Sequence, residues 1–246
     1  MNQITMTGMV LQTAPVGEYD RRVVILTKEQ GKISAFARGA RKPNSPLVGA
    51  VNLFTFGQFT LYAGRSSYTI QSVHVENYFS ELRDDIIAAY YGFYFMEYAM
   101  YFTKEANDER EMLKLLYQTL KALTNPKIPN RLIRYVFELK ALCINGQAPQ
   151  VFQCTCCGST EHSMVFSPRK GGLVCTECDG DVIDGMRLNN STLYTLQYVE
   201  NSKIEHLYTF IVKENVLDEL GRLMERYNDL YVDKRFKSLE ILETLL

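Results

Sequence analysis

Four cysteines are spaced as the ligands of a single metal ion. Two CxxC pairs are separated by 17 residues, within the roughly 15–20 residues typical of a four-cysteine zinc site. Two residues between cysteines let both thiolates of a tight turn face one ion, and two such turns complete a tetrahedron. Gly171 and Gly172 favour a turn between two short strands, so a zinc-ribbon-like module is predicted over residues 151–185. The predicted ligands of a structural Zn²⁺ are Cys154, Cys157, Cys175 and Cys178.

Other chemistries of these cysteines are less consistent with the sequence. The chain starts without a basic segment followed by an apolar one, so we expect no secretory signal, and cytoplasmic cysteines are usually reduced. A thioredoxin-like redox motif needs one CxxC on a βαβ unit, which the pattern lacks. An iron–sulfur cluster stays open as an alternative. Cys143 and Cys156 fall outside the spacing, and we expect them to be bystanders.

The sequence predicts no catalytic site. Four thiolates fill a tetrahedron and leave no position for a reactive water. The segment His74–Glu76 resembles the H-x-E of zinc deaminases, but no proline precedes either CxxC pair. Gly31–Ser34 lacks the upstream glycine of a phosphate-binding P-loop. We therefore expect neither an enzyme nor a nucleotide cofactor.

Composition indicates a soluble globular protein with an uneven charge distribution. The 246 residues are 46% hydrophobic, and no apolar run reaches the roughly 18 residues of a membrane span, so we expect a cytoplasmic protein without a membrane partner. The net charge of −1 hides about +5 in residues 1–75 and about −6 in the remainder. The segment from Val151 to Asp184 is itself acidic. A basic N-terminal third on an acidic body predicts that the N-terminal part faces a polyanion.

Alternating apolar residues predict about five strands in residues 1–78. The strands are expected at 6–11, 22–27, 32–38, 54–62 and 67–73. Five strands without an intervening long helix favour a small closed barrel, since closure removes exposed edges. An OB-type barrel fits this count, and an SH3-like barrel is the alternative.

Cations gather in and around one loop of the predicted barrel. Residues 38–46 contain Gly39, Pro43 and Pro46, which exclude regular structure there. Such a loop is often merely solvated, but its place on a basic barrel favours phosphate contact. The candidate residues for contact with nucleic-acid phosphates are Lys32, Arg38, Arg41, Lys42 and Arg65, extended by Arg21 and Arg22.

From about Asp84 the apolar period becomes helical. Residues 79–150 and 186–246 are predicted to form one helical domain with the zinc module inserted between them, which makes the whole chain α+β. Helices are expected at 111–123, 131–144, 191–200, 210–227 and 238–246, besides an aromatic helix from Ile86 to Tyr101. The tyrosines of that aromatic helix are expected in a bundle core, and a groove for an apolar peptide stays open. A candidate second basic surface comprises Arg222, Arg226, Lys234, Arg235 and Lys237, and its alternative is a solvated helix face.

Several stretches in order resemble the bacterial recombination mediator family RecO over essentially the whole chain. They are Gly17–Arg21, Gly31–Arg41, Phe166–Pro168 with Gly171 and Gly172, and Arg235–Leu239. The resemblance implies an N-terminal OB barrel, a helical domain and a zinc module. Some relatives lack the cysteines, whereas this chain has all four.

The resemblance also implies a non-enzymatic function in recombinational DNA repair. Such a protein binds single- and double-stranded DNA, anneals complementary strands, engages the C-terminal tail of the single-stranded DNA-binding protein (SSB), and pairs with RecR to help load recombinase. It would be cytoplasmic and associated with the nucleoid. A zinc-ribbon protein–protein adaptor without DNA binding stays the alternative function.

Overall fold

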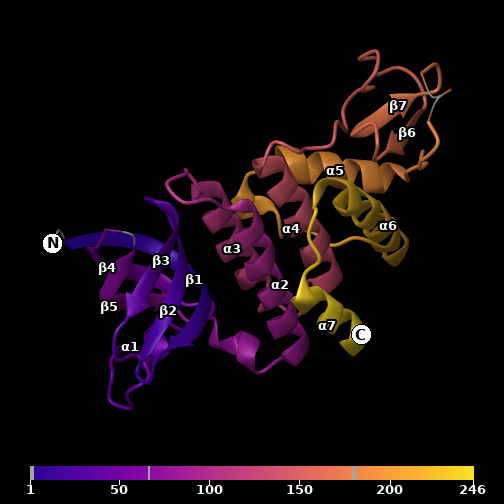
Figure 1. Cartoon of the computed structure of the whole chain (residues 1–246). Helices are drawn as coiled ribbons and strands as arrows, with labels where there is room; N and C mark the ends of the chain where they lie inside the picture. The colour runs from indigo at the N-terminus through magenta and orange to yellow at the C-terminus, as the bar shows by residue number, and fades with distance from the viewer. Residues whose placement is uncertain (1–2, 66, 179, 181) are drawn as a thin grey trace. The chain divides into compact units, whose positions relative to one another are not determined.

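The computed structural model describes residues 3–65, 67–178, 180 and 182–246. The chain divides into two compact units (Figure 1). One unit comprises Met1–Thr124 together with Phe236–Leu246, and the other comprises Asn125–Arg235. The combination of an N-terminal sheet with later helices confirms the predicted α+β class.

The first unit begins with a five-stranded closed barrel. Its strands are β1 (Gln3–Val16), β2 (Asp20–Thr27), β3 (Gly31–Ala37), β4 (Phe56–Ala63) and β5 (Tyr68–Asn77). Their order is β1-β2-β3-β5-β4, and the long β1 pairs with both β2 and β4, which closes the ring. As far as the structure describes the barrel, β3 and β5 pair in parallel and the other neighbouring strands pair antiparallel. This is the predicted OB-type barrel rather than the SH3-like alternative.

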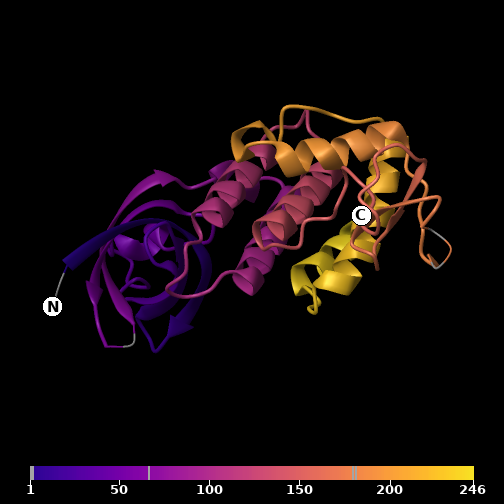
Figure 2. The ribbon, with the colours of Figure 1, turned by 90° about the horizontal axis from the view of Figure 1, so that it is seen from above.

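Strict alternation of side chains builds the barrel core. On β3, Ile33 and Ala35 point inward and are buried, whereas Ser34 between them is partly exposed. Phe59 and Leu61 on β4 do the same. The strands curve around this apolar interior (Figure 2), and the short helix α1 (Leu47–Ala50) contributes the buried Leu47 to it.

Three helices complete the first unit, together with a 3-10 turn at Ser80–Arg83. They are α2 (Ile86–Phe102), α3 (Arg110–Leu123) and α7 (Lys237–Leu245). The Asp85 carboxylate caps the start of α2. It accepts hydrogen bonds from the backbone N–H groups of Ile87 at 2.9 Å and Ala88 at 3.0 Å.

The predicted aromatic stripe of α2 is largely core. Tyr94 and Tyr98 are buried, and their rings lie 5.4 and 5.3 Å from that of Phe236, measured between centroids. The Ser238 hydroxyl donates to the Glu97 carboxylate at 3.0 Å. These contacts fasten the end of the chain, through α7, to α2 (Figure 1).

The second unit contains the remaining helices and a two-stranded hairpin. They are α4 (Asn130–Ile144), β6 (Met164–Ser167), β7 (Gly172–Cys175), α5 (Asn190–Asn201), a 3-10 turn at Ile204–His206, and α6 (Glu214–Tyr231). Lys140 of α4 donates through Nζ to the carbonyl oxygens of Glu200 and Ser202, both at 2.8 Å, which ties α4 to the end of α5. Among the described residues, no helix has the length and apolar character that a membrane crossing requires.

Candidate metal centre and candidate nucleic-acid interface

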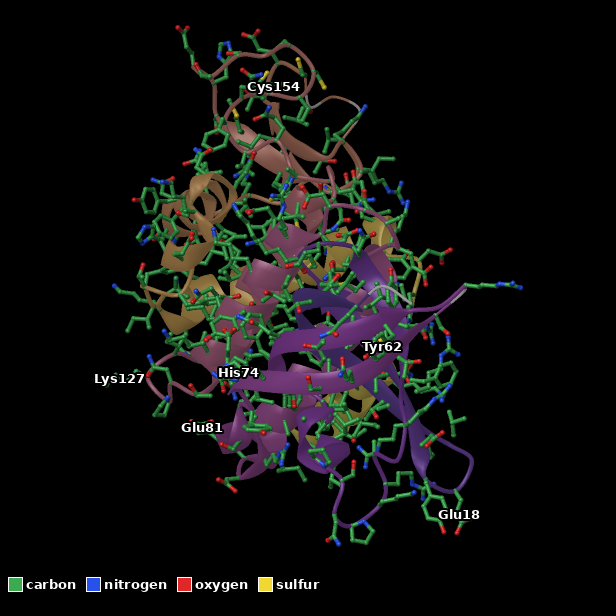
Figure 3. The ribbon with its side chains drawn as sticks, turned by 90° about the vertical axis from the view of Figure 1, so that its left-hand side faces the viewer. Glu18, Tyr62, His74, Glu81, Lys127 and Cys154 are labelled. Atoms are coloured by element: carbon green, nitrogen blue, oxygen red, sulfur yellow. The ribbon has the colours of Figure 1, made fainter. Side chains whose placement is uncertain are left out.

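The four predicted cysteines lie together at the open end of the β6–β7 hairpin; Figure 3 labels the first of them, Cys154. Their sulfur atoms all lie within 4.8 Å of one another, and Cys157 Sγ is 3.6 Å from Cys175 Sγ. A tetrahedral zinc ion with Zn–S bonds of about 2.3 Å places its sulfurs about 3.8 Å apart. The distances and the all-thiol donor set therefore fit Zn²⁺.

Two tight turns and the hairpin bring these cysteines together. The Gly158 N–H donates to the Cys154 carbonyl at 2.9 Å, and the Cys178 N–H donates to the Cys175 carbonyl at 2.9 Å. Gly158 has φ +74°, in the left-handed region that favours glycine. Cys175 is the last residue of β7, so the hairpin places the turn at Cys175–Cys178 beside the turn at Cys154–Gly158.

Backbone N–H groups prepare one of the thiols for ionisation. Burial opposes ionisation of the Cys154 thiol, but the backbone N–H groups of Cys157, Cys175 and Cys156 outweigh it and lower the pKa to about 6. The Cys178 thiol shares hydrogen bonds with the sulfurs of Cys175 and Cys157, and these raise its pKa to about 12. A divalent cation binds the thiolate form and would replace the shared protons.

The two remaining cysteines lie outside the cluster. Cys156 is exposed, and its sulfur is not part of the four-sulfur group. Cys143 lies on α4, where burial raises its pKa to about 12.

At the turn end of the hairpin, the Asp184 carboxylate accepts from the Ser167 hydroxyl at 2.6 Å and the Arg169 backbone N–H at 2.9 Å. Hydrogen bonds to Asp184 thus hold the turn end of the hairpin, and the four clustered cysteines lie at its open end.

The predicted basic loop folds against the turn between β1 and β2. Arg41 Nη1 donates to the Gly17 carbonyl at 3.0 Å, and Lys42 Nζ lies 5.2 Å from the centroid of the Tyr19 ring. The Gly39 N–H donates to Asp20 Oδ1 at 2.7 Å. Figure 3 labels Glu18, which belongs to the same β1–β2 turn. Exposed cations of the 38–46 loop are therefore held beside this turn; they are Arg38, Arg41 and Lys42.

The other predicted DNA-binding residues differ in their surroundings. Arg65 is exposed in the turn between β4 and β5. Arg22 is exposed on β2 and donates from Nε to the Ser34 hydroxyl at 2.9 Å, while Arg21 donates to Asn52 Oδ1 at 2.8 Å. Lys32 is half-buried, and its Nζ donates to the Met100 carbonyl at 2.6 Å in the last turn of α2. The charge of Lys32 thus serves a helix end.

The candidate second basic surface spans two elements and the segment between them. Arg222 and Arg226 are exposed one turn apart on α6. Lys234 and Arg235 follow α6 in the second unit, whereas Lys237 begins α7 in the first. The last turn of α6 contains no basic residue, so its arginines are not helix-end cations.

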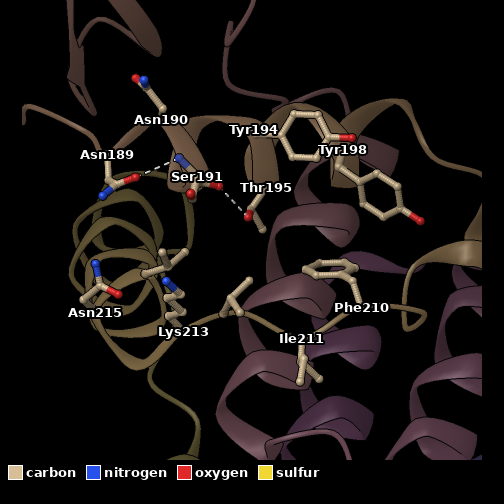
Figure 4. Close-up of a pocket in the computed structure, with 12 residues that line it drawn as sticks. Asn189, Asn190, Ser191, Tyr194, Thr195, Tyr198, Phe210, Ile211, Lys213 and Asn215 are labelled. Atoms are coloured by element: carbon tan, nitrogen blue, oxygen red, sulfur yellow. Dashed lines mark hydrogen bonds between the residues drawn. The ribbon is translucent and has the colours of Figure 1, made fainter.

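The second unit also contains a cavity of about 820 Å³ between α5 and the start of α6. Tyr194 and Tyr198 project from α5, and Phe210 lies opposite them (Figure 4). Ile211 is exposed at its edge, with Lys213 directly before α6. The sequence pattern placed a helix start at Phe210, but α6 begins only at Glu214. The apolar pattern of residues 210–213 therefore wrongly indicated a helix, and nothing in the sequence indicated the cavity.

Comparisons with known proteins agree over both parts of the chain. Residues 1–79 match the family described as Recombination protein O N terminal, and residues 83–240 match Recombination protein O C terminal. A DNA repair protein RecO of Acetivibrio thermocellus is 34% identical, covering 100% of this chain and 98% of its own length. RecO proteins of Alkaliphilus metalliredigens and Symbiobacterium thermophilum are 32% and 30% identical over 95% and 97% of this chain, and 96% of their own lengths.

Proposed function

The chain belongs to the RecO family of DNA repair proteins, and from this premise we propose that it is a recombination mediator that binds DNA through its N-terminal barrel. Family membership supports a role in DNA repair and recombination. Within that role, the protein binds single- and double-stranded DNA, anneals complementary strands and, with RecR, helps load recombinase onto SSB-coated DNA. It acts without a catalytic site, in the cytoplasm and on the nucleoid.

The observation that carries this proposal is the grouping of cations around the β1–β2 turn. Arg41 and Lys42 are held beside Gly17 and Tyr19 rather than on a free loop. Cations in this arrangement neutralise phosphates and release counterions, which gives affinity independent of base sequence. Annealing needs no nucleotide hydrolysis, because base pairing drives it once strand repulsion is screened. The β4–β5 turn adds one cation to those of β2 and the 38–46 loop, so six contribute: Arg21, Arg22, Arg38, Arg41, Lys42 and Arg65.

Charge reversal tests the position of the DNA. The logarithm of single-strand affinity falls with the logarithm of salt concentration by about 0.7 per phosphate contact. Removing three of six contacts in R38E/R41E/K42E should therefore relax the slope from about −4 to about −2. A matched variant, K28E/K104E/K121E, reverses three exposed lysines of the same unit outside this surface. An unchanged salt slope in R38E/R41E/K42E, or equal changes of slope in both variants, would contradict DNA binding on this face of the barrel.

The four-cysteine cluster is proposed to hold a structural zinc ion. Such an ion supplies cross-linking of two turns that lack a large core of their own. Cys154, Cys157, Cys175 and Cys178 fill its tetrahedron, so the module stabilises the fold and takes no part in a reaction. The acidity of this segment agrees with DNA contact on the barrel instead.

The cavity between α5 and α6 suits the tail of SSB. An acidic, apolar C-terminal peptide would place its aromatic side chain against Tyr198 and Phe210. Lys213 and the start of α6 would attract its negative charge. This gives the second unit a peptide-binding role separate from the barrel.

A zinc-ribbon protein–protein adaptor without DNA binding is the second candidate, supported by the same cysteine cluster and peptide-sized cavity. It does not require the basic barrel surface. Absence of DNA binding at low salt would favour it.

A further inference from the structure

One row of side chains crosses the outer face of the barrel at a level set by strand register. Phe36 on β3 pairs with Arg22 on β2 on one side and with Thr69 on β5 on the other. Thr69 in turn pairs with Tyr62 on β4. The row therefore reads Arg22, Phe36, Thr69, Tyr62 over four neighbouring strands, although these residues are far apart in sequence.

Alternation shows that this row points away from the core. The neighbours of Phe36, Ala35 and Ala37, are fully buried inside the barrel. Leu61 beside Tyr62 is also buried there. Phe36 and Tyr62 therefore face outward and are partly exposed; Figure 3 labels Tyr62 on this barrel.

Basic segments lie on both sides of the row. Along β3, the loop with Arg38 and Arg41 begins two residues after Phe36. The β4–β5 turn with Arg65 begins two residues after Tyr62. Because β5 starts opposite Ala35 and runs parallel to β3, this turn leaves the row in the opposite direction along the strands. Phosphate-binding cations thus flank two outward aromatic rings.

We infer that Phe36 and Tyr62 are a base-stacking subsite that makes the barrel prefer unpaired nucleotides, with Arg22 at the end of the row. This rests on the proposed DNA-binding function and specifies its substrate. Two strand spacings, about 9.6 Å, separate the backbones of Phe36 and Tyr62 in this row. Neighbouring bases in a duplex rise only about 3.4 Å along each strand. Neighbouring duplex bases therefore cannot reach both rings, and each duplex base is covered on both faces by its neighbours. A base that stacks on one of these rings must be unstacked, as a single strand allows.

Stacking is compatible with annealing. A ring covers the face of a base and leaves its pairing edge free. The flanking cations hold the backbone meanwhile, so the row presents bases to a complementary strand.

The test compares an oligothymidylate with an oligonucleotide of the same length whose bases are all absent, at one salt concentration. Both carry the same phosphates, so their affinity ratio isolates base contacts. Each ring should contribute about tenfold, equivalent to about 1.4 kcal/mol, giving a ratio of about 100 in the unmodified protein. Phe36→Leu and Tyr62→Leu should each lower this ratio about tenfold. Tyr78→Leu, at an exposed tyrosine outside the row, should retain it.

Fluorescence keeps the inference testable if a leucine variant folds poorly. The chain has no tryptophan, so Phe36→Trp introduces a single reporter. Its emission should be quenched by oligothymidylate and not by the baseless oligonucleotide, while Tyr78→Trp should respond to neither. Equal affinity of the unmodified protein for both oligonucleotides would overturn the stacking subsite alone. No binding to either would overturn the DNA-binding function, and the subsite with it.

Discussion

Replacing Cys175 by serine should remove the metal and loosen one end of the β6–β7 hairpin. Cys175 is fully buried, and its backbone N–H donates to Cys154 Sγ at 3.3 Å. A structural four-cysteine site contributes about 10–16 kcal/mol of binding free energy. Apart from cysteines, the buried member of the surrounding hydrophobic cluster is Val174, whose burial contributes about 1.5–3 kcal/mol. A bound metal would therefore be the dominant source of order here.

The loss of order should be confined to the cysteine end. The Phe166 N–H donates to the Met186 carbonyl at 2.8 Å, and its ring lies 6.0 Å from that of Tyr227 on α6. These contacts do not depend on the metal. Amides at residues 154–159 and 175–178 should exchange freely in Cys175→Ser, while the Phe166 amide stays protected.

Metal analysis and hydrogen exchange on the full-length protein provide the readouts. The unmodified chain should contain about one zinc ion and the variant should contain almost none. Cys156→Ser is the matched control, because Cys156 is exposed and outside the cluster. Full zinc content and unchanged exchange in Cys175→Ser would refute the structural-zinc proposal, as would equal losses in both variants.

Two further predictions concern the second unit. A peptide ending in acidic residues and phenylalanine should bind to the cavity between α5 and α6 at micromolar concentration in titration calorimetry. Lys213→Glu should lower the affinity for this peptide about tenfold, while Lys203→Glu, outside the cavity, should leave it unchanged. No binding by the unmodified protein would remove this partner. Asp184→Ala should lower the free energy of unfolding by about 2 kcal/mol at pH 7, whereas Glu161→Ala should not, as thermal melts would report. Burial opposes ionisation of Asp184, but its hydrogen bonds with Ser167 and Arg169 lower its pKa in the folded protein. The contribution of Asp184 to stability is therefore present above the pKa of the unfolded chain, near 3.9, and disappears as the pH falls below about 4. A stability difference between Asp184→Ala and the unmodified protein that persists at pH 2 would contradict this.

Local patterns predicted much of the fold. Turn glycines and alternation placed β2 and β3 within one or two residues, because a hairpin depends on neighbouring sequence. The extent of β1 was underestimated: it continues from Leu11 to Val16 past Pro15, since its second half pairs with β2. Pairing supplied by another strand overrides weak local propensity.

Features built from distant segments were not accessible to sequence reasoning. The row of Phe36 and Tyr62 depends on the parallel β3–β5 pairing, which no hairpin signal encodes. Lys32 reads as one more cation of a basic segment, yet it binds a carbonyl of α2, 68 residues later. The cysteine cluster is the converse case, because CxxC spacing alone indicates its geometry.

The affinity of the unmodified protein for a single-stranded oligonucleotide between 50 and 200 mM salt tests the central proposal most directly. With six phosphate contacts, affinity should fall about 300-fold across this range, and R38E/R41E/K42E should show a clearly shallower decline. Absence of binding at 50 mM salt, or an affinity insensitive to salt, would contradict DNA binding by the barrel and favour the adaptor function.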